Sequence, residues 1–199
     1  IGAEAQRRDA IDDLKLSLEM AKEMGAEFVL TSPANGGYLA TYDQLWSRLE
    51  KNIQELGDYA AKLEIKLVVE ALTPYESNFF TRANDLVELF RRVDNPYVVG
   101  MCDIVPPFVQ HESIMAYFDK LGNKMDHMHI IDGENGSDTH LIPGEGNIPI
   151  KEMLYEMKRI GYDKTATLEL VTNYINEPRF YAKRAIDNMR ELMAEAGIV

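Results

Sequence analysis

The sequence predicts an α/β protein, a (β/α)8 barrel in which helices cover a ring of parallel strands. Amphipathic helices alternate with short apolar strands along all 199 residues, and such alternation predicts right-handed crossovers and a parallel sheet. No glycine-rich phosphate loop follows the first strand, and polar side chains end four strands in succession rather than gathering at one switch point. Both observations favour a barrel over a doubly wound sheet.

Apolar side chains at three- and four-residue steps identify the helices. Residues 10–24 place Ile11, Leu14 and Leu18 on one face and end at Gly25, which accepts the left-handed conformation common after a helix. The helix over 41–63 begins at Thr41-Tyr42-Asp43-Gln44, which resembles a capping box. Further helices are predicted over 84–93, 112–121, 150–160 and 178–194.

Short apolar runs between the helices predict the strands. They lie at residues 28–30, 65–70, 97–103, 125–131 and 165–170. Five strands and six helices fill about five and a half of eight barrel units of about 31 residues each. Because the chain opens on a helix, we expect the first three strands and two helices of the barrel to be absent. Residues 1–199 then form a single, N-terminally incomplete barrel domain.

Composition narrows the classes of function. The chain is 46% hydrophobic and 27% charged, as expected for one globular domain with a large core. Its net charge of −12 disfavours nucleic acid as a partner, since phosphate binding needs clustered Lys and Arg. A single cysteine, Cys102, excludes an intrachain disulfide, and no apolar run reaches the length of a membrane helix. We therefore expect a cytoplasmic protein without membrane contact.

Four acidic or imidazole side chains lie at the ends of four successive strands. Glu70, Asp103 and Glu169 close apolar runs, and His129 lies near the end of the run over 125–131. Because the carboxyl ends of parallel strands converge on one rim, these side chains are expected to meet. Taken singly, each is more often a loop or core residue than a ligand. Together, three carboxylates and an imidazole suit a hard or borderline divalent ion.

Longer runs around these positions resemble a known family. The matching runs are Glu70-Ala71-Leu72-Thr73-Pro74-Tyr75-Glu76-Ser77-Asn78, Asp103-Ile104, His127-Met128-His129-Ile130-Ile131-Asp132, Ser137-Asp138-Thr139-His140, Pro143-Gly144-Glu145-Gly146 and Leu168-Glu169-Leu170-Val171. They resemble the sugar isomerase and epimerase branch of the xylose isomerase-like TIM barrels. The resemblance covers nearly the whole chain, which lacks the family's N-terminal quarter.

This resemblance implies an isomerase of carbohydrate metabolism, an epimerase that inverts C3 of a ketose or of a ketosamine such as fructoselysine. It implies one divalent ion, Mn²⁺, Co²⁺, Zn²⁺, Ni²⁺ or Mg²⁺, held by Glu70, Asp103, His129 and Glu169. The ion would stabilise an enediolate, while Glu70 and Glu169 serve as acid and base on opposite faces of the substrate. Which glutamate is the base depends on the handedness of the substrate.

The resemblance also suggests substrate-binding residues and a homo-oligomer. Glu76 resembles a contact to a substrate hydroxyl, although a solvent-exposed glutamate is as common at such a position. Asp138 and His140 resemble extra metal ligands of endonuclease IV, a relative with three zinc ions, but Pro106 stands where that enzyme has a further histidine. We therefore interpret Asp138 and His140 as substrate-binding or loop-ordering groups.

Other interpretations remain open beside the epimerase. The second interpretation is an aldose–ketose isomerase that acts on a sugar or a sugar phosphate. It is also compatible with a non-catalytic fragment or interaction module, and more distantly with an endonuclease. The position at which solvent hydrogen enters the substrate separates the two isomerase reactions.

Overall fold

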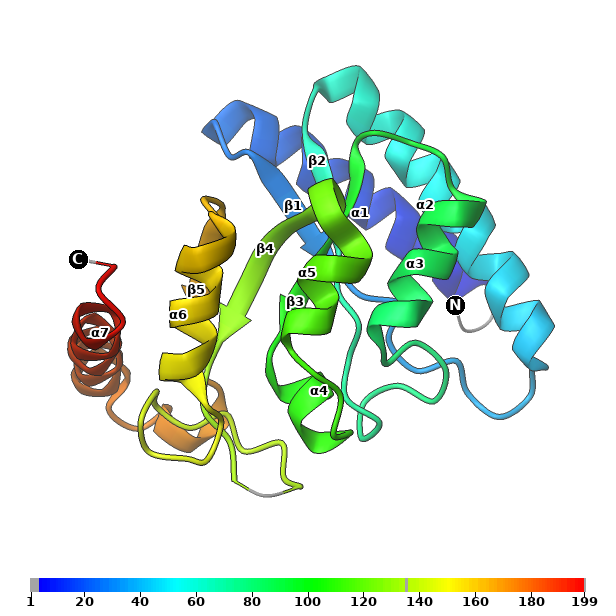
Figure 1. Ribbon diagram of the computed structural model, residues 1–199. Coiled ribbons are helices and arrows are strands. Elements are labelled where there is room, and N and C mark those ends of the chain that lie inside the picture. The colour runs from blue at the N-terminus through cyan, green and yellow to red at the C-terminus, as the bar shows by residue number, and fades with distance from the viewer. Residues whose placement is uncertain (1–3, 135, 199) are drawn as a thin grey trace. The chain divides into compact units, whose positions relative to one another are not determined.

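The computed structural model describes residues 4–134 and 136–198 of the chain. The chain divides into two compact units, residues 1–101 with 120–126 and residues 102–119 with 127–199. Strands and helices alternate through both units (Figure 1). Three elements begin in one unit and end in the other: β3 (Val98–Asp103), α5 (Met115–Leu121) and β4 (Met125–Ile130).

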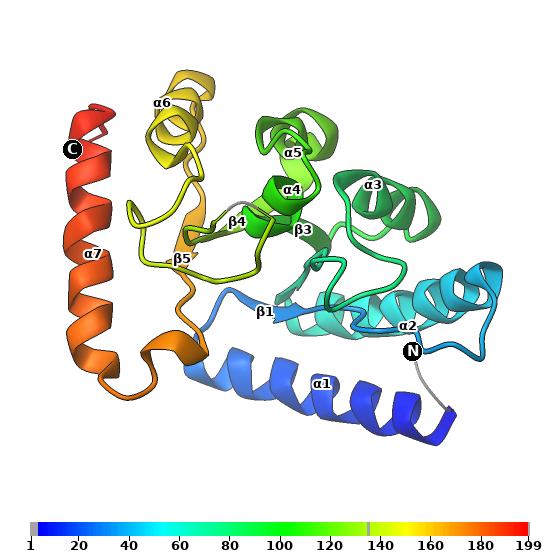
Figure 2. The same ribbon diagram turned by 90° about the horizontal axis from the view of Figure 1, so that it is seen from below.

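The first unit is a parallel sheet with helices packed on it. Strands β1 (Phe28–Thr31), β2 (Lys66–Val69) and β3 are neighbours in that order. Thr31 pairs with Val69, and Val69 pairs with Gly100, so the carboxyl ends of the strands lie at one edge. The helices of this unit include α1 (Glu4–Met24), α2 (Tyr42–Leu63) and α3 (Ala83–Arg92). Figure 2 shows α1 running alongside α2 and β1.

Local sequence explains where α2 begins and ends. The Thr41 hydroxyl accepts the Gln44 backbone N–H at 3.3 Å, and the Gln44 side chain accepts the Thr41 N–H at 2.9 Å, so the predicted capping box is confirmed. Glu64 ends the helix in the left-handed conformation with φ of 56°. Between these ends the predicted apolar face is buried. The core of the sheet gathers Val68, Val99 and Met101.

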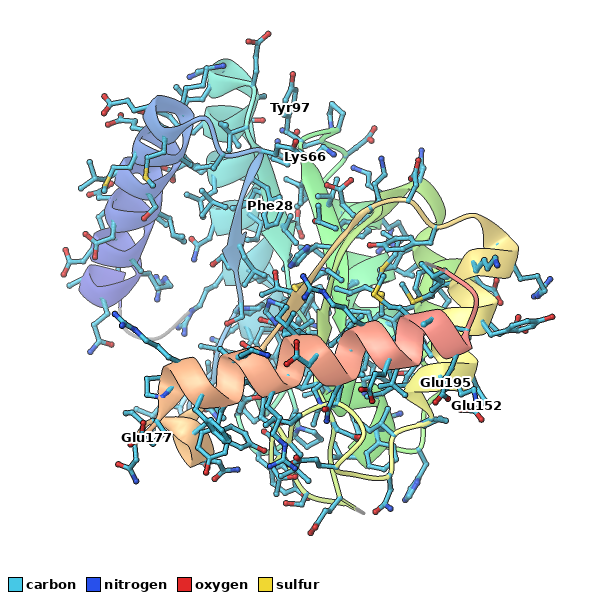
Figure 3. All side chains as sticks on the ribbon, turned by 90° about the vertical axis from the view of Figure 1, so that its left-hand side faces the viewer. Phe28, Lys66, Tyr97, Glu152, Glu177 and Glu195 are labelled. Atoms are coloured by element: carbon cyan, nitrogen blue, oxygen red, sulfur yellow. The ribbon has the colours of Figure 1, made fainter. Side chains whose placement is uncertain are left out.

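A paired charge lies at the amino ends of the strands. Phe28, Lys66 and Tyr97 stand where β1, β2 and β3 begin (Figure 3). The Lys66 ammonium contacts both carboxylate oxygens of Asp126 at 2.8 Å, and Asp126 is buried. Hydrogen bonding and charge together balance this carboxylate, so we assign the pair a structural role.

The second unit contains α4 (Val105–Val109), most of β4, α6 (Ile150–Ile160), β5 (Thr165–Leu168) and α7 (Pro178–Glu195). Two short 3₁₀ turns complete the elements, η1 (Gly122–Lys124) in the first unit and η2 (Thr172–Tyr174) in the second. Strands β4 and β5 are parallel, with His129 opposite Thr167. The Ile104 N–H, directly after β3, donates to the His129 carbonyl at 3.3 Å. Helix α7 packs on α6.

The predicted alternation is confirmed, with three differences in the helices. The described residues contain seven α-helices rather than six, because α4 forms at Val105–Val109. Pro106 and Pro107 lie in the first turn of α4, where the fixed φ of proline fits the helical conformation. His111 has a φ of 55°, which is not helical, and the helix predicted over 112–121 begins only at Met115. Helix α1 begins at Glu4, ahead of the predicted residue 10, because its first turns carry no buried apolar side chain to mark them.

The described residues contain five parallel strands with helical crossovers, and this arrangement fits part of a (β/α)8 barrel. Within the described residues, no helix is long and apolar enough to cross a membrane.

Candidate metal centre

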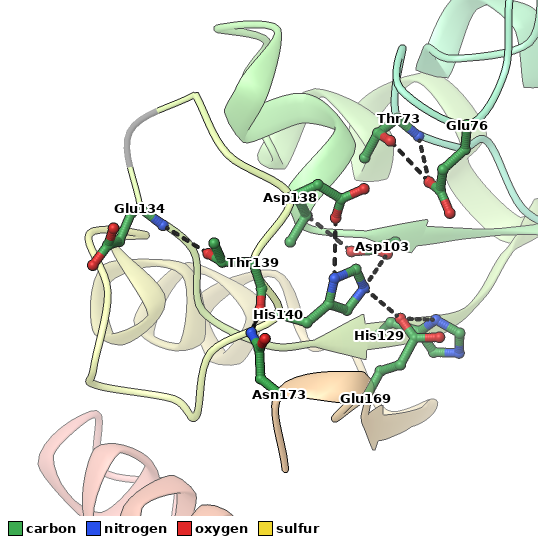
Figure 4. Close-up of polar contacts among 11 residues, drawn as sticks. Thr73, Glu76, Asp103, His129, Glu134, Asp138, Thr139, His140, Glu169 and Asn173 are labelled. Atoms are coloured by element: carbon green, nitrogen blue, oxygen red, sulfur yellow. Dashed lines mark hydrogen bonds and ion pairs between the residues drawn. The ribbon is translucent and has the colours of Figure 1, made fainter. Parts of the chain in front are cut away.

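Three of the predicted ligands come together at the ends of β3, β4 and β5. Asp103 is the last residue of β3, His129 is the next-to-last residue of β4, and Glu169 directly follows β5. Each offers a ligand atom within 4.8 Å of the others'. Asp103 and His129 are buried, whereas the Glu169 side chain is 33% exposed. Figure 4 shows these side chains pointing toward one another.

Backbone contacts fix the orientation of Asp103. One of its carboxylate oxygens accepts the Val105 N–H at 2.8 Å, at the point where the chain turns into α4. The other oxygen lies 3.9 Å from Nε2 of His140. With one oxygen engaged by the backbone, the second is held facing the neighbouring side chains.

His129 is supported by a second histidine one layer deeper in β4. The His127 ring stands edge-on to the His129 ring, with the ring centres 5.5 Å apart. Its two ring nitrogens lie 2.7 Å from the Thr165 hydroxyl and 3.2 Å from the Thr167 hydroxyl of β5. These contacts join β4 to β5 directly beneath His129, whose Nδ1 lies 3.3 Å from Glu169.

His140 lies against the cluster from the loop after β4. Its Nε2 is 3.1 Å from Glu169 and its Nδ1 is 3.0 Å from Asp138. Thus the structure brings Asp138 and His140, two of the predicted substrate-binding residues, into the same network (Figure 4). The backbone φ of His140 is 45°, which is uncommon for a non-glycine residue, so the loop holds the imidazole at a conformational cost.

Two pKa values in this network are strongly displaced. Burial lowers the pKa of His140, but hydrogen bonds to Asp138 and Glu169 and the charge of Asp103 outweigh it and raise the value to about 10. Burial raises the pKa of Glu169, but hydrogen bonds from His129 and His140 outweigh it and lower the value to about 2. At neutral pH the Glu169 carboxylate is therefore ionised and the His140 imidazole is protonated.

Asp132 organises the loop that carries His140. Its buried carboxylate accepts hydrogen bonds of 2.9–3.0 Å from four backbone N–H groups, those of Gly133, Gly144, Gly146 and Ile148. A Cβ at Gly146 would lie 2.4 Å from an Asp132 oxygen, so the loop needs glycine there. Asp132 also exchanges two backbone hydrogen bonds with Leu141, the residue after His140. Asp132 is not among the predicted site residues, although an Asp before a Gly-rich turn is a usable signal in the sequence.

The other two predicted residues lie in the first unit. Glu70 directly follows β2, is buried, and donates its backbone N–H to the Thr31 carbonyl at 3.0 Å. It therefore stands at the carboxyl edge of that sheet. Glu76 lies six residues further along, and one of its carboxylate oxygens accepts the Thr73 N–H at 3.1 Å and the Thr73 hydroxyl at 2.9 Å (Figure 4).

The donor set of the second unit fits a divalent cation. Two carboxylates and an imidazole, largely buried, suit Mn²⁺, Co²⁺, Ni²⁺, Zn²⁺ or Mg²⁺. A buried cluster with surplus negative charge is costly unless a cation offsets it. The additional histidine of a three-zinc site has no counterpart, because Pro106 is buried in the first turn of α4.

Comparison with known proteins gives one family and several relatives. The xylose isomerase-like TIM barrel family matches residues 2–192. Fructoselysine 3-epimerase of Shigella flexneri is 46% identical over 195 residues, which cover 98% of this chain and 71% of that protein.

Two solved structures share the fold. A D-tagatose 3-epimerase-like protein superposes with a TM-score of 0.80 at 21% identity, covering 98% of this chain and 72% of the other. D-psicose 3-epimerase from Clostridium cellulolyticum H10, solved with D-tagatose, gives a TM-score of 0.71 at 20% identity. In that comparison the alignment covers 84% of this chain and 58% of the other.

Proposed function

The chain belongs to the xylose isomerase-like TIM barrel family, and on that premise we propose that it is a divalent-metal-dependent sugar epimerase. In this proposal it inverts C3 of a ketose or a ketosamine, with a fructoselysine-like compound as the leading substrate. The observation that carries the proposal is the meeting of Asp103, His129 and Glu169 at the ends of three strands. Identity of 46% to a fructoselysine 3-epimerase supports the substrate class. Epimerases are isomerases, and the chain is assigned to that enzyme class.

We assign the cation to four ligands, Asp103, His129, Glu169 and Glu70. Glu70 is included because it directly follows β2, as Glu169 follows β5, and because it is buried at the carboxyl edge of its sheet. A divalent cation bound there would supply the positive charge that stabilises negative charge developing on substrate oxygens. The hydrogen bond from the Val105 N–H would keep the Asp103 carboxylate in its orientation, and the contact with the His127 ring would keep the His129 ring in its orientation.

Glu70 and Glu169 carry the proton transfers in this proposal. Inversion at C3 requires one group that removes the proton from one face and another that delivers a proton to the opposite face. Glu169 is ionised at neutral pH, because hydrogen bonds from His129 and His140 lower its pKa to about 2. The handedness of the substrate decides which glutamate is the base.

The remaining predicted residues position the substrate. His140, held by Asp138 at 3.0 Å, presents its Nε2 toward Glu169 and donates to a substrate hydroxyl or to that carboxylate. Glu76 keeps one carboxylate oxygen on Thr73 and offers the other to a sugar hydroxyl.

A homo-oligomer and a cytoplasmic location stay predictions. Light scattering together with sedimentation would check the oligomeric state.

Solvent-exchange labelling tests the reaction. The metal-loaded chain is incubated with fructoselysine in deuterium oxide, and the labelled carbon is located by NMR. The proposal expects deuterium at C3 and inverted product, and it expects Glu169→Gln to lower the rate by about 10³-fold. Glu191→Gln, which makes the same change on the exposed face of α7, serves as the matched control and keeps full activity. Deuterium at C1 or C2 would instead indicate an aldose–ketose isomerase.

A further inference from the structure

The loop that carries His140 is attached on both sides of this residue to the 3₁₀ turn η2. The Asn173 side chain donates to the Thr139 carbonyl at 2.6 Å (Figure 4). The Tyr174 hydroxyl accepts the Ile142 N–H at 3.0 Å. Thr139 directly precedes His140, and Ile142 follows it by two residues. The turn after β5 therefore holds the short stretch of backbone from which the imidazole extends.

Helix α7 holds the next residues of the same loop. The Asn188 side chain donates to the Pro143 carbonyl at 3.0 Å. Arg184, one turn earlier in α7, forms an ion pair with Glu145. All of these contacts lie within the second unit. The chain after β5 thus binds the loop at several points between residues 139 and 145.

Burial distinguishes the Tyr174 contact from that of Asn173. Ile142 is 0% exposed and Tyr174 is 9% exposed, and both belong to one apolar cluster with Ala185. The Tyr174 ring also packs on the Tyr181 ring, with the ring centres 4.8 Å apart. Water does not reach the buried Ile142 N–H, so no solvent molecule replaces the hydroxyl if it is removed. Asn173 is exposed, and water can take over its contact.

These contacts close a ring that includes the Glu169–His140 pair. Nε2 of His140 lies 3.1 Å from Glu169, which directly follows β5. The backbone runs from Glu169 to Tyr174, whose hydroxyl binds the Ile142 N–H. From Ile142 the loop leads back to His140. In a closed ring the position of one side chain depends on every contact that closes it, so the position of the imidazole depends on Tyr174.

We propose that Tyr174 is a positioning residue that fixes His140 against Glu169, with Asn173 as a weaker support on the exposed side. Tyr174 acts through the Ile142 N–H and the loop backbone. The proposal rests on the proposed function, because there His140 donates to a substrate hydroxyl or to Glu169. Removal of the Tyr174 hydroxyl opens the ring at its buried contact and lets the imidazole leave its place.

Exchange of the His140 ring N–H with water, measured by ¹⁵N NMR, tests this assignment in the full chain saturated with Zn²⁺. The signal of this ring is identified by its loss in His140→Gln. In Tyr174→Phe the aromatic ring still packs on Tyr181, but the acceptor of the Ile142 N–H is gone. We expect the His140 ring N–H to exchange about tenfold faster in this variant, because the loop opens more often.

Two control variants separate positioning from a general loss of stability. Tyr181→Phe removes the same group from the neighbouring ring, and that hydroxyl makes no hydrogen bond to the part of the chain that the structure describes. Met189→Ala shortens a buried side chain of α7 and lowers stability without removing a hydrogen bond to the loop. Both are expected to keep the slow exchange of the His140 ring N–H.

Asn173→Ala keeps the proposal testable if Tyr174→Phe folds poorly. Asn173 is exposed, so its truncation leaves the core intact. Because water replaces part of its contact with the Thr139 carbonyl, we expect the His140 ring N–H to exchange only about threefold faster.

Epimerisation kinetics give the second readout, with rates expressed per bound metal ion. A misplaced imidazole no longer meets the substrate hydroxyl correctly, so we expect kcat of Tyr174→Phe to fall by about tenfold while the metal affinity is unchanged. Tyr181→Phe and Met189→Ala are expected to keep the kcat of the unmodified protein.

Unchanged exchange of the His140 ring N–H in both Tyr174→Phe and Asn173→Ala would overturn the assignment. Equally fast exchange in Tyr174→Phe and Met189→Ala would overturn it too, because loss of stability alone would explain both. The exchange measurement needs no substrate. Exchange that depends on Tyr174 in a chain that does not epimerise would remove only the proposed reaction, whereas epimerisation at C3 without any effect of Tyr174→Phe would remove only the positioning role.

Discussion

Buried carboxylates are balanced differently in two regions of the molecule. At the amino ends of the strands, Asp126 has both oxygens 2.8 Å from the Lys66 ammonium, so one cation offsets one anion. At the carboxyl ends, Asp103, Asp138 and Glu169 all lie around the imidazole of His140, and Glu169 also contacts His129. A satisfied pair stabilises the fold, whereas a cluster with surplus negative charge is suited to bind a cation.

Substitution in each region should separate activity from stability. Asp103→Asn keeps an oxygen that accepts the Val105 N–H but removes a ligand charge, so we expect kcat/KM to fall by about 10³-fold with little change in unfolding free energy. Lys66→Met leaves the buried Asp126 without its partner. Because Lys66 is itself 41% exposed, we expect a loss of only about 2 kcal/mol and unchanged activity after refolding.

Steady-state kinetics and urea unfolding of both variants check this contrast. Loss of stability in Asp103→Asn comparable to that in Lys66→Met would show that the cluster, like the pair, is structural. Loss of activity in Lys66→Met at full folding would show that the amino end also contributes to the reaction.

Asp132 tests whether the loop positions His140. In Asp132→Asn the amide nitrogen replaces an oxygen that accepts two of four backbone N–H groups, so the loop loses its fixed path. We expect kcat to fall by about 10- to 100-fold while the cation affinity changes little. The paired measurement is kcat against metal affinity by competition with a chelator. A loss of metal affinity as large as the loss of kcat would contradict a role limited to the loop.

The smallest expected effect is a pH dependence in the metal-free protein. The pKa of His140 is raised from 6.5 to about 10, so its stabilising contribution is complete below pH 6.5 and disappears as pH rises toward 10. The pKa of Glu169 is lowered from 4.5 to about 2, so its contribution is present above pH 4.5 and disappears as pH falls toward 2.

Thermal unfolding between pH 6 and 10 checks the His140 contribution. His140→Gln should remove the decline that the unmodified metal-free protein shows over this range. His111→Gln changes an exposed histidine and serves as the control. An unchanged decline in His140→Gln would assign the pH dependence to another group.

The sequence predicted much of the fold because its signals were local. Helix α2 carried a capping box at Thr41 and an apolar face, and both were confirmed. Residues at strand ends predicted the meeting of Asp103, His129 and Glu169, because parallel strands place their carboxyl ends at one edge. Helix α4 was not predicted, because Pro106 and Pro107 suggest a loop unless it is known that they lie in the first turn of a helix.

The supporting residues of the site were not predictable in the same way. Asp132 accepts hydrogen bonds from four backbone N–H groups. Every residue except proline has such a group, so the sequence does not show which of them bind Asp132. His127 acts through hydroxyl groups of Thr165 and Thr167, and this contact depends on the register of β4 with β5. Tertiary pairing, rather than local pattern, decides both contacts.

Anomalous diffraction from crystals grown with Mn²⁺ tests whether the four proposed ligands bind one cation. We expect one anomalous peak, about 2.2 Å from carboxylate oxygens of Glu70, Asp103 and Glu169 and from a ring nitrogen of His129. A peak bound only by Asp138 and His140, or no peak at saturating Mn²⁺, would contradict it.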